Sequence, residues 1–166
     1  MMQNHGKEQG EGEGMEVSQA KGAGNDGILI NEMQQESFWN ISPKWSFENF
    51  DFEHDKWSFK NLKTPSVLLR RLQSYEFQTL GDMCSRLGVG NTRSHYIFVD
   101  QLCAEARKRI SELKTLKEDV DFKDKLFSLY LTSKERLWGI IRNDGTFSVI
   151  WYDPRHEVYP VTKRHT

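Results

Sequence analysis

The spacing of hydrophobic residues changes along the chain from a helical period to a strand-like period. Between residues 63 and 117 apolar positions recur every three or four residues, which predicts helices. The first helix is expected to begin at Thr64-Pro65, because proline in the first helical position sacrifices no hydrogen bond. A second, short apolar face covers residues 80–87. A third helix is predicted over 100–113 with Asp100 as its N-cap, and the polar run 114–124 reads as a connector.

Beyond residue 125 the pattern is typical of strands joined by tight turns. Asn143-Asp144-Gly145 is a strong hairpin signal, because these residue types tolerate positive φ. Asp153-Pro154 ends the run, since proline cannot donate to a strand ladder. Trp138 and Trp151 are expected to pack as a cross-strand or core pair. The predicted strands cover residues 126–131, 136–142 and 146–152, with a turn at 132–135 and a possible short last strand at 157–159.

Helices followed by strands define the expected fold class. Such an order predicts an α+β domain over residues 63–166, with the helices packed on one face of a three- to four-stranded antiparallel meander. The 166-residue length suits one domain of this kind with an additional disordered tail.

The first 62 residues differ in composition from the rest. Residues 1–27 hold seven of the twelve glycines and no aromatic residue, so we expect a disordered acidic tail. Residues 28–62 form an aromatic-acidic arm that contains Trp39, Trp45 and Trp57. Two interpretations of this arm stay open: aromatic strands or loop anchors packing on the domain, or an acidic arm covering a basic site.

Charge is uneven along the chain, although the net charge is only −1. Residues 63–117 carry ten basic and five acidic side chains, whereas the segments before them are acidic. A basic face favours polyanions such as nucleic acid, and a solvated helix surface is the alternative.

Several classes of protein are excluded or disfavoured by the sequence. No apolar run is long enough for a membrane span, and two cysteines make no disulfide framework, so a cytoplasmic protein without membrane contact is expected. The common nucleotide-binding and hydrolase motifs are absent, and no cofactor is expected. Asp153, His156 and His165 lack a repeated ligand spacing, so we expect no metal site.

One interpretation of residues 80–102 is a helix-turn-helix that binds DNA. A short helix, a glycine-containing turn and a polar segment would direct Asn91, Thr92, Arg93, Ser94 and His95 at the major groove. Against this, residues 95–99 are β-branched and aromatic, which favours a strand over a recognition helix.

A second interpretation covers about residues 100–160. The basic helix QLCAEARKRISEL, a connector and the meander LFSLYLTSKERLWGIIRNDGTFSVIWYDPRHEVYP together resemble the RelE/HigB-type toxin superfamily. The matching positions are Arg136 on the second strand, and His156 and Tyr159 after the third. The SH-x-I, LWG and WYDP-x-H-x-V-x-P segments are also similar to those of uncharacterised bacterial and phage proteins.

The resemblance implies metal-independent RNA cleavage on the ribosome, with an antitoxin-like protein as a partner. His156 would act as base or acid, Arg136 and Arg155 would hold phosphate, and Tyr159 would stack on a base or position a hydroxyl. Two sequence features depart from this pattern: the first strand carries no basic cluster beyond Lys125, and Asp153 and Glu157 flank the phosphate site. Further basic residues would extend the RNA-binding surface: Arg107, Lys108, Lys163, Arg164 and His165.

The same residues have structural interpretations. His156 fits a turn histidine hydrogen-bonded to Asp153, and Arg136 fits half of a surface ion pair with Glu135. Neither interpretation places Arg136 or His156 in the core, so both side chains are expected to be replaceable without loss of the fold. A non-enzymatic DNA-binding or protein-interaction protein of a mobile element therefore remains the functional alternative.

Overall fold

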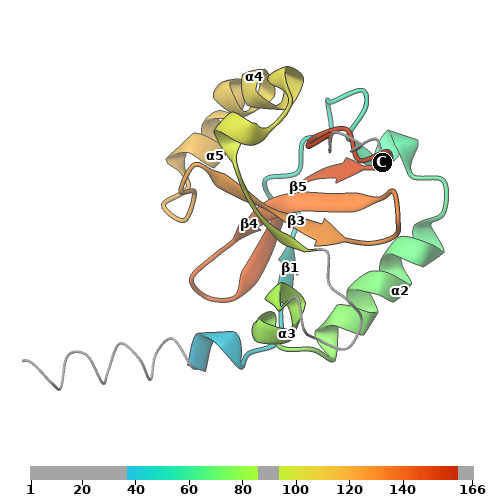
Figure 1. Cartoon of the computed structure of the whole chain (residues 1–166), viewed down its shortest axis with the longest axis vertical. Coiled ribbons are helices and arrows are strands. Elements are labelled where there is room, and N and C mark those ends of the chain that lie inside the picture. Colours follow the sequence, from blue (N-terminus) through green and yellow to red (C-terminus); the bar gives the residue numbers. More distant parts are fainter. Residues whose placement is uncertain (1–36, 86–93, 161–166) are drawn as a thin grey trace, which may run out of the picture.

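The computed structural model describes residues 37–85 and 94–160 (Figure 1). The described part of the chain also contains 3₁₀ turns at Phe59–Asn61 and Val99–Gln101. The predicted tail, residues 1–27, lies outside the described part of the chain. In chain order the elements are β1 (Lys44–Ser46), α2 (Pro65–Glu76), α3 (Leu80–Cys84), β2 (His95–Phe98), α4 (Ala104–Glu112), α5 (Lys114–Glu118), β3 (Lys125–Tyr130), β4 (Arg136–Ile141) and β5 (Thr146–Asp153).

The α+β class is confirmed, and the sheet is larger than the expected meander. Five strands lie in the order β1-β5-β4-β3-β2. The predicted antiparallel meander is present as β3, β4 and β5, and Trp138 pairs with Trp151 in register as expected. Two strands add to it, because β2 pairs antiparallel with β3 and β1 pairs parallel with β5, so the sheet is mixed. The expected last strand at 157–159 is wrong, since this segment is irregular.

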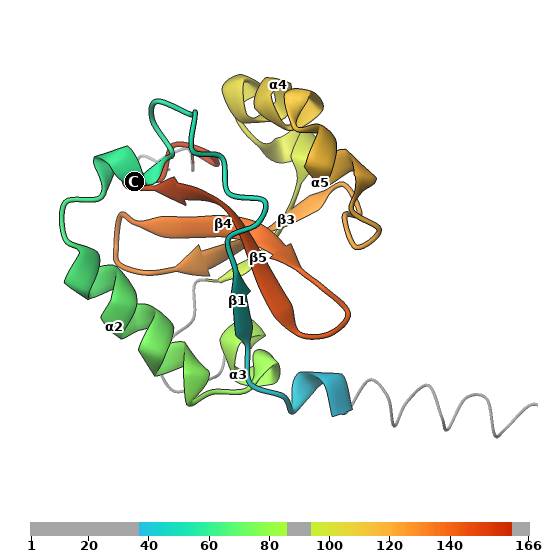
Figure 2. The ribbon, with the colours of Figure 1, turned by 180° about the vertical axis from the view of Figure 1, so that it is seen from behind.

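Helices cover both faces of the sheet, which corrects the expectation of one covered face. α4 and α5 lie on one side, and α2 and α3 lie on the other, as opposite views show (Figures 1 and 2). The strands show the physical reason: β4 and β5 are buried at nearly every position, a pattern typical of strands covered on both faces.

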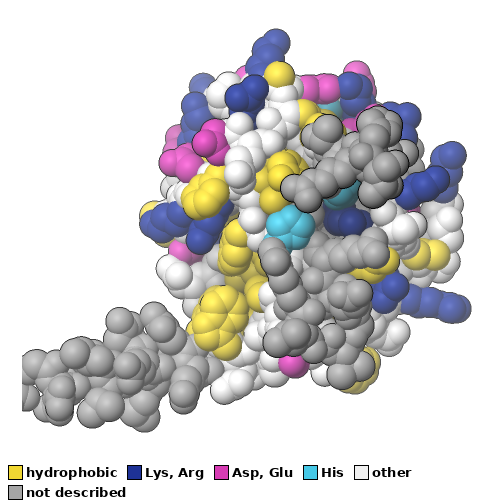
Figure 3. Space-filling view, in the orientation of Figure 1, with side chains coloured by type: hydrophobic (Ala, Val, Ile, Leu, Met, Phe, Trp, Pro, Cys, Tyr) yellow, Lys and Arg dark blue, Asp and Glu magenta, His cyan; other side chains and the backbone are white. Residues whose placement is uncertain are grey.

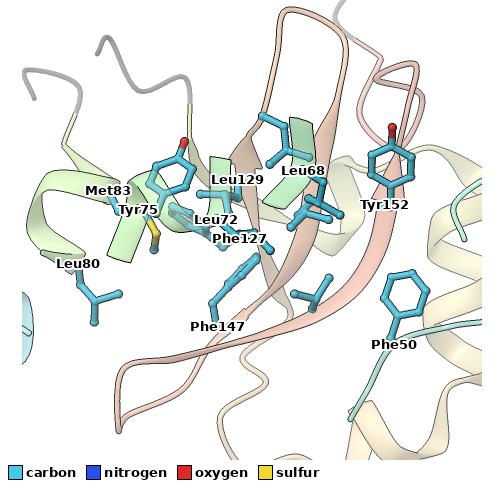
Figure 4. Packing of buried hydrophobic residues seen from close by; sticks show 13 residues of the cluster. Phe50, Leu68, Leu72, Tyr75, Leu80, Met83, Phe127, Leu129, Phe147 and Tyr152 are labelled. Atoms are coloured by element: carbon cyan, nitrogen blue, oxygen red, sulfur yellow. The ribbon is translucent and has the colours of Figure 1, made fainter. Parts of the chain in front are cut away.

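Each face of the sheet has its own hydrophobic core. On the α2 side, Leu72 and Tyr75 of α2 lie beside Leu129 of β3 (Figure 4). On the α4 side, Trp138 and Trp151 are fully buried together with apolar residues of α4 and α5. Two separate cores hold the sheet from both sides, so the sheet itself is the rigid scaffold for any site at its edge.

The β4–β5 hairpin turns at Asn143-Asp144-Gly145, as the sequence predicts. Gly145 has φ +82°, and its N–H donates to the carbonyl oxygen of Arg142. The Asp144 carboxylate accepts hydrogen bonds from the backbone N–H and hydroxyl of Thr146. These contacts fix the register of the two most buried strands.

The helix starts are partly as expected. α2 begins at Pro65 directly after Thr64, as predicted. The predicted N-cap Asp100 is wrong, because this residue lies in a 3₁₀ turn and α4 begins after Cys103, whose sulfur accepts from the N–H of Ala106. The expected connector at 114–124 is also wrong over its first half, where α5 forms and buries Leu116.

Residues 44–62 pack within the same two cores as the strands and helices. β1 contains Trp45, whose ring contacts Tyr75 and Phe147, and Trp57 is fully buried on the α4 side. These contacts agree with the interpretation of the arm as a strand and loop anchors.

An ion pair fastens this segment to α4. Asp51 is buried and accepts two hydrogen bonds of 2.7 Å from Arg109 and one of 3.1 Å from the indole N–H of Trp151. Burial raises the pKa of Asp51, but these hydrogen bonds outweigh it and hold the pKa below its ordinary value. Arg109 is therefore committed to a structural contact.

No helix in residues 37–85 and 94–160 is long and apolar enough to cross a membrane.

Candidate functional site

The strand register brings several polar side chains to one face at one end of the sheet. Tyr130, Arg136 and Asp153 are cross-strand neighbours at the ends of β3, β4 and β5. A second row lies two residues away along the strands. In this row His95 pairs with Ser128, Ser128 with Trp138, and Trp138 with Trp151. Residues two apart in a strand share a face, so both rows face the α4 side.

Arg136 is the buried centre of the first row. Its side chain is buried, with the residue only 4% exposed, and its guanidinium carbon lies 4.7 Å from the centre of the Tyr130 ring. One terminal nitrogen donates to the carbonyl oxygens of Thr132 (2.6 Å) and Glu135 (2.8 Å). The expectation that Arg136 lies outside the core is therefore wrong. Its buried guanidinium stabilises the β3–β4 turn through these two hydrogen bonds.

Tyr130 is held in place by two further elements. Its carbonyl oxygen accepts from the hydroxyl of Tyr75 on α2 (2.6 Å), and its N–H donates to the hydroxyl of Ser94 just before β2 (2.9 Å). Arg71 of α2 lies 5.8 Å from the centre of its ring. The ring of Tyr130 is thus close to two arginines, Arg71 of α2 and Arg136 of β4.

Asp153 shapes the turn that carries His156. Its carboxylate is fully buried and accepts hydrogen bonds from the backbone N–H groups of Arg155, Glu157 and Val158. His156, in the middle of this turn, has φ +61°. The acidic residue next to the proposed phosphate site thus has a structural role in shaping the turn.

His156 lies within electrostatic range of His95 at this end of the sheet. Burial lowers the pKa of His156, the positive charge of Arg136 lowers it further, and Asp153 partly offsets both. His95 is close enough for its charge to contribute to the same lowering. Histidine and basic side chains are also neighbours on the face shown in Figure 3. At neutral pH the imidazole of His156 is therefore uncharged and can accept a proton.

The other predicted site residues are more scattered. Arg155 is exposed and lines a pocket at the same end of the sheet. Tyr159 is half-buried against the α4-side core, and Arg107 and Lys108 are exposed on α4. Three expected RNA-binding residues and three expected DNA-binding residues lie outside the described part of the chain: Lys163, Arg164, His165, Asn91, Thr92 and Arg93.

The structure bears on the helix-turn-helix interpretation at His95. This residue is the first of strand β2, which agrees with the strand-like character of residues 95–99. His95 therefore lies on a sheet edge and not on a recognition helix.

Sequence reasoning missed Tyr130, Tyr75 and Ser94 as parts of the site. One signal was available for Tyr130: in a hairpin centred on Ser133, residues equally far from that centre become neighbours, so Tyr130 faces Arg136. Tyr75 and Ser94 reach the site through tertiary packing, for which the sequence contains no local signal.

Within residues 37–85 and 94–160, no three His, Cys, Asp or Glu side chains are grouped so that they could hold a metal ion. Comparisons with protein-family models, curated proteins and solved structures found no match to this chain.

Proposed function

We propose that this chain binds RNA at the β3–β5 end of the sheet and cleaves it without a metal ion, as its resemblance to RelE/HigB-type toxins implies. The observation that carries the proposal is that His95, His156 and the buried Arg136 lie at the same end of the sheet, with His156 within electrostatic range of the other two. Metal-independent RNA cleavage needs one group that takes a proton and one that returns it, together with a cation near the phosphate.

The proposed reaction assigns one proton step to each histidine. Neutral His156 removes the proton from a ribose 2′-hydroxyl, whose oxygen then forms a bond to the adjacent phosphorus. The bond from phosphorus to the 5′-oxygen breaks, and His95 donates the proton that this leaving oxygen takes up. The products are a 2′,3′-cyclic phosphate and a free 5′-hydroxyl.

Arg136 acts in this proposal through its charge and not as an exposed phosphate ligand. Its Nη1 is bound to the carbonyl oxygens of Thr132 and Glu135, so it keeps His156 neutral and stabilises negative charge from beneath the surface. Exposed Arg155, Arg107 and Lys108 supply phosphate contacts, and Tyr159 is the proposed stacking residue. The ribosome and an antitoxin-like protein are the proposed partners.

Cleavage of labelled single-stranded RNA in the presence of EDTA, followed by cleavage of mRNA on ribosomes, tests the proposal. His156→Asn removes the imidazole but suits the left-handed backbone, so we expect a rate loss of about 10²–10⁴-fold with the fold intact. His54→Asn is the matched control, because His54 stacks on Trp57 and has no role in the proposed reaction, and asparagine also offers an acceptor to the backbone N–H groups that His54 binds.

Two results would overturn the proposal. One is the absence of cleavage on free RNA and on ribosomes alike, and the other is cleavage by His156→Asn at the rate of the unaltered protein. Preferential binding of duplex DNA that is lost in Arg93→Ala and kept in His156→Asn would favour the DNA-binding alternative.

A further inference from the structure

A pocket of about 500 Å³ opens at the same end of the sheet as the proposed reaction site, between segments that are distant in sequence. Its walls come from the 3₁₀ turn and the residues after it (60–63), from the β3–β4 turn (132–135) and from the end of β5. Tyr152 lines the pocket and belongs to the α2-side core, whereas His95 faces the α4 side. The pocket and the two histidines therefore lie on opposite sides of the same sheet end.

The pocket is strongly basic. Lys60, Lys63, Lys134 and Arg155 line it, and all four are exposed. Arg155 pairs with Glu157 at 3.3 Å, while among the described residues the three lysines take part in no ion pair. Three cationic side chains without a carboxylate partner around one cavity create a positive potential that attracts phosphate.

The one acidic residue in the wall is already engaged. The Glu135 carboxylate accepts hydrogen bonds from the hydroxyls of Thr132 and Tyr152. Both donors belong to the protein, so the carboxylate is held against the wall. Its negative charge remains, but it is partly balanced by these donors and by the surrounding lysines.

The pocket walls are fixed before any ligand arrives. Arg136 binds two carbonyl oxygens of the β3–β4 turn, and the Thr132 hydroxyl accepts from the N–H of Glu135. On the opposite wall the side-chain amide of Asn61 donates to the carbonyl oxygens of Asp55 and Lys56. A preorganised site loses less entropy on binding, which favours ligand affinity.

We infer that this pocket binds a nucleotide of the RNA strand, with its phosphates against Lys60, Lys63 and Lys134. The volume suits a nucleotide-sized ligand, and Leu62 and Pro154 give the apolar surface that a sugar or base requires. The inference rests on the proposed function for the identity of its ligand. It deepens that function by giving the strand a second anchoring point, across the sheet end from the histidines.

The test is equilibrium binding of a fluorescein-labelled single-stranded RNA of about 12 nucleotides to the full chain carrying His156→Asn. In this background Lys63→Ala/Lys134→Ala should weaken binding about 25-fold at about 0.1 M salt, and should lower the slope of log K against log salt by about 1.4, because two phosphate contacts are lost. Lys114→Ala/Lys117→Ala on α5 is the control, since it removes the same charge from exposed residues on the other side of the sheet.

Equal affinity and equal salt slope for the two double variants would overturn the inference, and so would an absence of RNA binding by the parent. ATP is added as a competitor in the same assay. Displacement of the RNA by ATP from the parent, and not from Lys63→Ala/Lys134→Ala, would support nucleotide binding in the pocket and would show that a free nucleotide also binds there. The assay needs no cleavage, so a pocket that binds RNA in a chain that does not cleave it would separate this inference from the proposed function.

Discussion

The backbone of His156 places a specific demand on the residue at this position. A φ of +61° is unusual for residues with a Cβ atom, and it is least unfavourable for asparagine, aspartate, histidine and glycine. We expect His156→Asn to leave the free energy of unfolding nearly unchanged, and His156→Val to lower it by about 1–2 kcal/mol. Urea denaturation of the two variants measures this, and equal stabilities would contradict the left-handed turn.

The lowered pKa of His156 predicts how stability depends on pH. Burial and Arg136 hold the pKa of His156 below the ordinary 6.5, so the folded protein binds this proton less well than the unfolded chain. Above pH 6.5 His156 therefore does not reduce the free energy of unfolding. As the pH falls through 6.5 toward the lowered pKa, protonation of the unfolded chain reduces this free energy.

His156→Asn should reduce this loss of stability without abolishing it, because burial also lowers the pKa of His54. Unfolding free energies of both proteins between about pH 5 and pH 8 give the comparison. The same slope in both proteins would show that His156 is not desolvated in the folded state.

Some residue-scale features followed from the sequence and others did not. The Trp138–Trp151 pair could be predicted because its two strands are joined by a recognisable tight turn. The placement of His95 at the same end of the sheet as His156 could not be predicted, because it depends on the pairing of β2 with β3 across two intervening helices. Sequence patterns specify local neighbours, whereas contacts of this kind are specified by the whole fold.

At the scale of elements, the contact between Asp51 and Arg109 joins α4 to the segment before the helices. Arg109→Met would leave the Asp51 carboxylate buried without its cation, which should lower the unfolding free energy by about 3 kcal/mol. Arg107→Met is the matched control on the same helix, where an exposed side chain should change stability by less than about 0.5 kcal/mol. Similar losses in both variants, measured by thermal or urea unfolding, would argue against a structural role for this pair.

The β4–β5 pairing contains a register shift at Trp138/Gly139 that limits what position 139 accepts. A Cβ atom there would collide with the backbone carbonyl oxygen of Ser148. Gly139→Ala should therefore lower the free energy of unfolding by an amount typical of overpacked core substitutions, about 1–3 kcal/mol, which thermal unfolding measures. Ser148→Ala, which keeps the backbone and removes only the side-chain hydroxyl, serves as the comparison. A Gly139→Ala protein as stable as the unaltered chain would contradict the close approach of the backbone at this register shift.

Element prediction succeeded where local signals were strong. The hairpin turn, the three strands of the meander and the start of α2 all depend on proline, glycine and β-branched residues close in sequence. β1 is only three residues long and pairs parallel with the distant β5. Such a short strand shows no alternation of hydrophobic and polar residues from which its pairing could be predicted. α5 was missed because a single buried leucine in five residues gives no helical periodicity.

For the whole molecule, coverage of both sheet faces explains where a site can form. The helices bury most of the sheet, and the polar row of Tyr130, Arg136 and Asp153 lies at one of its ends. The two-histidine site and the basic pocket occupy opposite sides of that end. The basic middle of the chain, noted in the sequence, contributes Lys63 to the pocket, while the other cations come from outside it.

The central claim is that His95 and His156 act as one proton-transfer unit, and a double-mutant cycle tests it most directly. Single-turnover RNA cleavage is measured for the unaltered chain, His95→Gln, His156→Asn and the double variant. Groups that act as a unit are not additive, so each single variant and the double variant should lose a similar factor of about 10²–10⁴. Losses that multiply in the double variant, or a His95→Gln protein that cleaves at the original rate, would contradict the claim.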